Sequence, residues 1–241
     1  IAVGTALLPL LSRQIRIGDS EAANASQNRA IEATLFLTLP ATVALFLLSE
    51  PIIRVLFERG AFGGVETKSS ALALTAYAAG LPAYVLVKVL APGFFARKDT
   101  TTPVKIAGIA VMLNIVLSVA LMIPFAHMGI ALATAIASWF NASLLAIGLW
   151  RRRNLILDAR LKRRLPRMVL ASLAMGGLAF WATKLLEAPL MGDEVERWIS
   201  LLVLVSASVG AYFLFALLLG AFEKGDLRTL FNKSTLDQTE A

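Results

Sequence analysis

The sequence predicts an all-α protein that crosses a membrane several times. Of its 241 residues, 58% are hydrophobic and 16% are charged, and the mean hydropathy is +0.74. A soluble domain carries about 25% charged residues, so this chain holds more apolar surface than one soluble core could bury. The apolar residues form long runs without sustained two-residue alternation, which favours a bundle of membrane-spanning helices over a barrel.

Six apolar runs are long enough to cross a hydrocarbon core, which takes about 20 residues of helix. They are residues 31–48, 69–94, 106–124, 128–150, 168–186 and 198–222. An apolar stretch at 1–11 lacks the charged start of a signal peptide. We expect it to be the end of a further helix, and the sequence to be the latter part of a larger protein.

Two polar segments between these runs have their own helical signals. Segment 12–29 is rich in alanine and should form a short cytoplasmic helix that begins near Asp19 or Ser20. Segment 50–60 is too short and too charged to cross, and its apolar residues share one helical face. We expect it to lie along the outer membrane surface.

Basic residues predict which ends of the helices face the cytoplasm. Segments 13–30, 95–105, 151–167 and 223–241 hold 17 of the 23 Lys and Arg residues, whereas the alternate segments hold four. Short loops rich in Lys and Arg stay in the cytoplasm. The sequence therefore predicts a multi-pass membrane protein with a cytoplasmic C-terminus.

Segment 151–167 contains eight basic residues. We interpret it as a topology determinant and an anchor for lipid headgroups, and a site for a phosphorylated partner is the alternative. This interpretation also accounts for much of the +7 net charge without a nucleic-acid partner. The segment separates the last two spans from the others and so predicts a boundary there.

The sequence offers little material for catalysis. It has no cysteine and a single histidine, His127, in a short external turn. It also lacks the HExxH, GxSxG and Walker motifs. We therefore expect a protein that is not an enzyme and holds no cofactor.

Ionisable residues inside spans are functional candidates because a charge near the bilayer centre is costly. Lys88 lies nine residues before Arg97, so it sits about 13 Å deeper along the helix axis. It either reaches back to the cytoplasmic interface or lines a transport path. Lys184 lies near the external end of its span and should reach the interface.

Neutral polar residues gather in two consecutive spans. Asn114 and Ser118 share one helix face, and the next span places Asn141 on a ladder of small residues with Thr134 beside it. A tight hairpin would bring these faces together. They form either hydrogen bonds between helices or a small cation site built from amide, hydroxyl and backbone oxygens.

Four motifs indicate a family. They are KVLAPGFFARKDTTTPVK at 88–105, GTALLPLLSR at 4–13, PIIRVLFERGAF at 51–62 and FNASLL at 140–145. Together they closely resemble the MurJ (MviN) lipid II flippases of bacteria, which belong to the multidrug/oligosaccharidyl-lipid/polysaccharide exporter superfamily. The resemblance extends from residue 1 to about residue 222.

The resemblance implies part of a two-lobe exporter with fourteen spans. Residues 1–150 would hold the end of span eight and spans nine to twelve, which belong to the second lobe. After the basic loop 151–167, residues 168–222 would form a pair of helices with a groove for a lipid tail. Residues 223–241 would be a cytoplasmic tail.

The implied activity is to move the lipid-linked peptidoglycan precursor lipid II across the bacterial inner membrane by alternating access. Its partners would be lipid II, membrane lipids, the missing N-terminal half and cell-wall synthesis proteins. Four basic residues match the family loop and are candidates for gating or headgroup binding: Lys88, Arg97, Lys98 and Lys105. Two other functions stay open, export of another lipid-linked oligosaccharide or of drugs, and a non-transporting scaffold for cell-wall enzymes.

The resemblance also implies coupling to sodium or to the membrane potential. Asn114, Ser118 and Thr134 fall at places comparable to a sodium site found in some members. The carboxylate that would complete such a site belongs to the seventh span, which this sequence does not contain.

Overall fold

The computed structural model describes residues 2–190 and 192–221. Every secondary-structure element in these ranges is a helix, as the sequence predicts. The helices are α1 (Ala2–Arg16), α2 (Ser20–Phe57), α3 (Gly64–Phe95), α4 (Thr101–Arg151), α5 (Ala159–Leu185), α6 (Glu187–Leu190) and α7 (Glu194–Leu218). The predicted tail at 223–241 lies outside the described residues.

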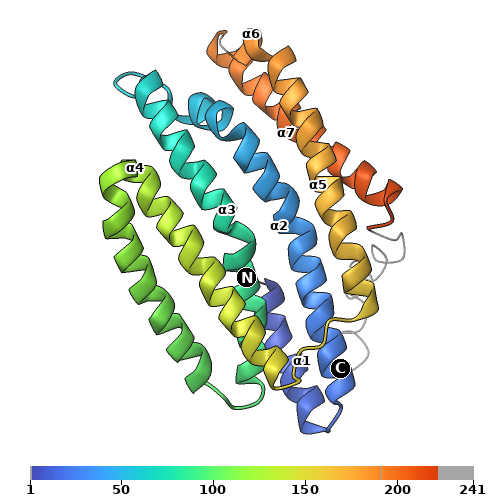
Figure 1. Cartoon of the computed structure of the whole chain (residues 1–241). Coiled ribbons are helices and arrows are strands. Elements are labelled where there is room, and N and C mark those ends of the chain that lie inside the picture. The colour runs from blue at the N-terminus through green and yellow to red at the C-terminus, as the bar shows by residue number, and fades with distance from the viewer. Residues whose placement is uncertain (1, 191, 222–241) are drawn as a thin grey trace, which may run out of the picture.

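The long helices stand in a row, in the order α4, α3, α2, α5 and α7 (Figure 1). All five are long and apolar enough to cross a membrane. The short α1 packs against α2 and α3, at the end of the bundle where α3 and α4 terminate. There Leu11, Leu35, Phe94 and Leu149 form part of a buried cluster that joins four helices.

Helix α4 contains two of the predicted spans. A straight helix of its 51 residues would be about 76 Å long, more than twice the thickness of a hydrocarbon core. The backbone reverses at Ala126, where φ is 47° and ψ is −126°, and Figure 1 shows the resulting hairpin. Gly129 permits this turn because a Cβ there would lie 2.1 Å from the carbonyl oxygen of Leu121.

Helix α2 corrects two expectations. It begins at Ser20 as predicted, with Asp19 as the N-cap whose carboxylate accepts the Ala22 N–H. It then continues for 38 residues to Phe57. The short cytoplasmic helix and the separate surface helix are therefore wrong as independent elements. At about 57 Å, α2 is long enough for both ends to extend beyond the hydrocarbon core.

A proline in α2 creates a contact with α7. Pro40 has no N–H, so the carbonyl of Phe36, four residues earlier, lacks its helical donor. The hydroxyl of Tyr212 on α7 donates to this carbonyl over 2.7 Å, and the Tyr212 side chain is buried. The hydrogen bond that α2 lacks at Pro40 is thus replaced by one that attaches α7 to α2.

Small residues bring neighbouring helices close together. A Cβ on Gly80 of α3 would lie 2.7 Å from the Cα of Ala135 on α4. A Cβ on Gly176 of α5 would lie 2.6 Å from Cγ1 of Val43 on α2. Close packing of this kind drives helix association in lipid, where the hydrophobic effect between helices is weak.

Candidate functional site

The polar residues Asn114, Ser118 and Thr134 meet between the two arms of α4. Asn114 Nδ2 donates to Thr134 Oγ1 over 3.3 Å, and Ser118 Oγ donates to Asn114 Oδ1 over 3.1 Å. Thr134 Oγ1 donates to the carbonyl of Ile130, one turn earlier. The structure therefore brings three of the four neutral candidates into one cluster.

This cluster offers oxygen atoms from neutral groups only. Amide, hydroxyl and backbone carbonyl oxygens are suitable ligands for a hard cation such as sodium. Among the described residues, no group of three His, Asp or Glu side chains could hold a metal ion. The cluster therefore offers neutral oxygen atoms of the kind that a sodium ion accepts, and coupling to sodium stays a prediction.

Asn141 and Lys88 lie apart from this cluster. Asn141 is seven residues beyond Thr134, about 10 Å along the axis, and its buried Oδ1 has no hydrogen-bond partner in the described part of the chain. The Nζ atom of Lys88 lies 4.3 Å from the ring centroid of Tyr84, one turn earlier on α3. This cation–π contact holds the ammonium group beside an exposed aromatic ring.

The loop between α3 and α4 is fixed by Arg97 and Asp99. Arg97 donates to the Gly93 carbonyl over 2.6 Å and reaches the Asn154 carbonyl at 3.5 Å. Asp99 accepts hydrogen bonds from the N–H and hydroxyl of Thr102 and from Arg152 at 2.5 Å. These bonds hold the pKa of Asp99 at about 2, below its ordinary value of 3.8. The loop is thereby tied to the end of α4.

The other two basic candidates are free to meet a ligand. Lys98 is exposed and adopts a left-handed backbone conformation with φ of 61°. Lys105 is exposed on the second turn of α4. The basic candidates therefore differ in their surroundings: Lys88 lies against Tyr84 and Arg97 holds the loop, whereas Lys98 on the loop and Lys105 on α4 are exposed.

A buried carboxylate at Glu32 was not among the sequence candidates. Its side chain is 8% exposed and pairs with Arg164 at 2.5 Å, with Arg160 at 3.3 Å and with Arg29. Arg29 also pairs with Asp158, just before α5. The network joins the start of α5 to α2. The signal in the sequence was an acidic residue at the start of a span, together with the basic loop.

The basic segment 151–167 therefore serves partly within the molecule. Arg152 pairs with Asp99, Arg160 and Arg164 pair with Glu32, and Arg167 donates to the Gly220 carbonyl over 3.0 Å. Its other basic residues are exposed or partly exposed, and they are Arg151, Arg153, Lys162 and Arg163. Those four remain available for lipid headgroups.

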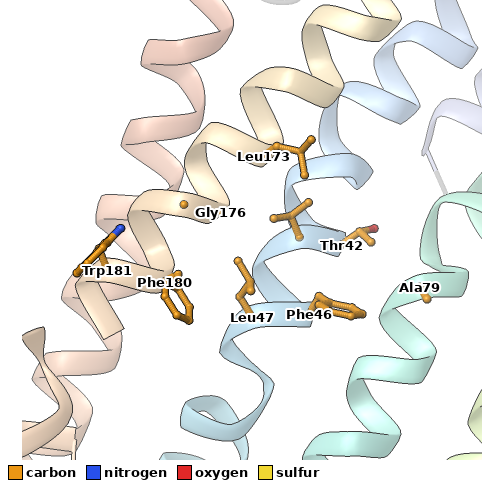
Figure 2. A pocket seen from close by; sticks show the side chains of 10 residues that line it. Thr42, Phe46, Leu47, Ala79, Leu173, Gly176, Phe180 and Trp181 are labelled. Carbon is orange, nitrogen blue, oxygen red and sulfur yellow. The ribbon is translucent and has the colours of Figure 1, made fainter. Parts of the chain in front are cut away.

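An apolar groove of about 460 Å³ opens between α2, α3 and α5. Figure 2 shows Leu47 of α2 beside Phe180 of α5, and Thr42 and Phe46 on the side of α2 nearer to Ala79 of α3. Among the described residues that line the groove, Thr42 carries the one hydroxyl, which donates to the Thr38 carbonyl of its own helix. The groove therefore presents hydrocarbon to whatever enters it.

A second apolar groove of about 420 Å³ lies on the other side of α5, between α2 and α7. Pro40 and Leu48 of α2 line it together with Val205 and Tyr212 of α7. Both grooves thus involve the C-terminal helices. The role of residues 168–222 in holding a lipid tail stays a prediction.

Comparison with known proteins identifies the relatives of this chain. The chain is 43% identical to a probable lipid II flippase MurJ of Rhizobium tropici over 95% of its length, and 45% identical to that of Rhizobium meliloti over 91%. These alignments cover 43% and 42% of the two relatives. The chain therefore spans less than half the length of these proteins.

Comparison of the fold with solved structures identifies the same family. A solved structure of lipid II flippase MurJ in an inward closed conformation matches 90% of this chain with a TM-score of 0.71 and 28% identity, and the match covers 42% of that protein. The helical bundle is therefore part of an exporter fold, as the motifs predict. The family model for lipid II flippase MurJ matches residues 1–222, and the chain belongs to this family of membrane proteins.

Proposed function

We propose that this chain forms the second lobe and the C-terminal helix pair of a lipid II flippase, a transporter rather than an enzyme. The observation that carries this proposal is the family match over residues 1–222. Because the relatives are more than twice as long, the rest of a full-length protein would complete the transport path. The substrate would be a peptidoglycan precursor on a long polyprenyl tail.

The grooves beside α5 support this proposal. A polyprenyl tail needs a hydrocarbon surface, and both grooves have almost entirely apolar linings. A diphosphate group needs cations, and Lys98 and Lys105 are exposed at the end of α3 and the start of α4. We assign Arg97 the role of holding the loop that carries Lys98.

The orientation and the energy source are part of the proposal. With the basic loops in the cytoplasm, the protein would lie in the bacterial inner membrane with its C-terminus inside. Asn114, Ser118 and Thr134 would supply neutral ligands for sodium, and the membrane potential is the other candidate driving force. Lipid II, bilayer lipids and cell-wall synthesis proteins would be the partners.

Complementation tests the function. The full-length gene should restore growth and lipid II translocation in bacteria depleted of their own flippase. Restored growth without translocation would contradict the proposal and favour a scaffold for cell-wall enzymes. Translocation of a different lipid-linked oligosaccharide alone would favour a related exporter.

A further inference from the structure

The apolar groove between α2, α3 and α5 continues into a charged mouth. A neighbouring pocket of about 320 Å³ shares Leu47 and Phe180 with the groove, so the two spaces adjoin. The mouth adds polar and charged side chains that the groove lacks, and these are Glu50, Arg54, Thr183 and Lys184. One continuous surface therefore changes from hydrocarbon to charge.

Lys184 is the cation of this mouth that is available to a ligand. Arg54 already pairs with Glu50 at 2.6 Å and with Glu58 at 3.5 Å on its own helix. No carboxylate in the described part of the chain pairs with Lys184. Its Nζ atom lies 5.0 Å from the ring centroid of Phe180, the residue shared by groove and mouth. The ammonium group is thus held where the two spaces meet.

The positions along α5 place this mouth at one face of the membrane. Lys184 lies 17 residues after Arg167, which is about 26 Å along the helix and close to the thickness of a hydrocarbon core of about 30 Å. The groove residues of α5, from Leu173 to Trp181, lie about 4–17 Å below Lys184. The groove therefore occupies the leaflet whose headgroups are level with Lys184.

We propose that Lys184 binds the phosphate of the translocated polyprenyl-diphosphate lipid in the outer leaflet while its tail lies in the groove. This inference rests on the proposed function and orientation, and it adds a release site for the product. The positive charge of Lys184 and its level in the membrane favour a lipid with a phosphate next to its tail. When the tail of such a lipid lies in this groove, its phosphate lies at the Lys184 ammonium group. Glu50 pairs with Arg54 at 2.6 Å, whereas Lys184 is left to meet the phosphate.

The test uses the full-length flippase in vesicles that contain lipid II among neutral phosphatidylcholine. A photoreactive phenylalanine analogue replaces Phe46, which lines the groove, and cross-linking to lipid II is measured. Lys184→Gln should lower this cross-linking about fivefold, the effect of losing one charge-assisted contact. Lys68→Gln removes a cation outside the mouth and should leave cross-linking unchanged. The same analogue at Ile115, on the far face of α4, gives the background.

Three outcomes would overturn the inference. They are equal cross-linking in Lys184→Gln and the parent protein, cross-linking at Phe46 no higher than at Ile115, and complete competition by an equimolar amount of phosphatidylglycerol. The last would identify the groove as a site for ordinary anionic phospholipid. Complementation by the unsubstituted gene is scored separately. If this gene restores growth but Lys184→Gln does not lower cross-linking, the release site is refuted and the proposed function stands.

Discussion

At the scale of single residues, the structure uses polar groups to join helices that apolar packing alone would not align. Tyr212 donates to a carbonyl that Pro40 leaves without its helical donor. Glu32 holds three arginines from two helices. Each group satisfies a buried partner whose desolvation would otherwise be costly.

Tyr212→Phe should destabilise the protein by about 1 kcal/mol, because it removes the buried hydrogen bond from the Tyr212 hydroxyl to the Phe36 carbonyl. The measurement is unfolding of the purified protein in detergent. Pro40→Ala supplies a helical N–H to the same carbonyl, so Tyr212→Phe should cost less in the Pro40→Ala background. Equal costs in both backgrounds would show that the hydroxyl and the proline are not coupled.

Asp99 gives the α3–α4 loop a defined pH response. Its folded pKa of about 2 is below the ordinary 3.8, so the stabilisation is fully present above about pH 4 and is lost as the pH falls towards 2. Hydrogen exchange at the Thr102 amide should be constant from pH 7 to 5, after correction for intrinsic rates, and should speed up below pH 4. Asp99→Asn should already exchange faster at pH 7. Indistinguishable exchange in the two proteins would refute the role of this carboxylate.

At the scale of helices, close approach sets the position of α5. Gly176→Ala places a Cβ 2.6 Å from Cγ1 of Val43, whose β-branched side chain has few other rotamers. We expect a loss of about 1–3 kcal/mol. Gly177→Ala is the matched control, because nothing lies within 4 Å of its Cβ. It should keep or raise stability by up to about 1 kcal/mol, measured by the same unfolding assay.

The membrane-length helices were largely predictable from the sequence, whereas the residues at which the helices begin and end were less so. Long apolar runs locate all the spans because a bilayer sets a minimum length. Segment 50–60 was misjudged because its own amphipathic pattern is compatible both with a surface helix and with the end of a longer one. The reach of α2 to Phe57 depends on packing against α5 and α7, which no local pattern encodes.

The candidate site was predictable only where its residues follow helical spacing. Asn114 and Ser118 share a face by their spacing, and the short turn after them brings Thr134 opposite. Glu32 and Arg164 are 132 positions apart, so only the tertiary fold reveals their pairing. The same holds for the groove, whose lining comes from three helices.

At the scale of the whole molecule, the distribution of charge gives a test of orientation. Ala61 and Thr100 are exposed in the loops before and after α3, and so lie at opposite ends of this helix. The chain has no cysteine. A membrane-impermeant thiol reagent should label Ala61→Cys on intact cells, and Thr100→Cys only after the membrane is opened. The reverse pattern would overturn the orientation and would place Lys184 in the inner leaflet.

The attachment of α7 at the Phe36 carbonyl also has a consequence for how these sequences can change. The Phe36 carbonyl can accept from Tyr212 because Pro40 has no N–H to donate to it. The contact therefore depends on the residue type at position 40 and not on the side chain at position 36. A substitution at Pro40 and one at Tyr212 should therefore compensate for each other across 172 positions. Related sequences without the proline would not need the tyrosine hydroxyl, so the residue types at the two positions should covary.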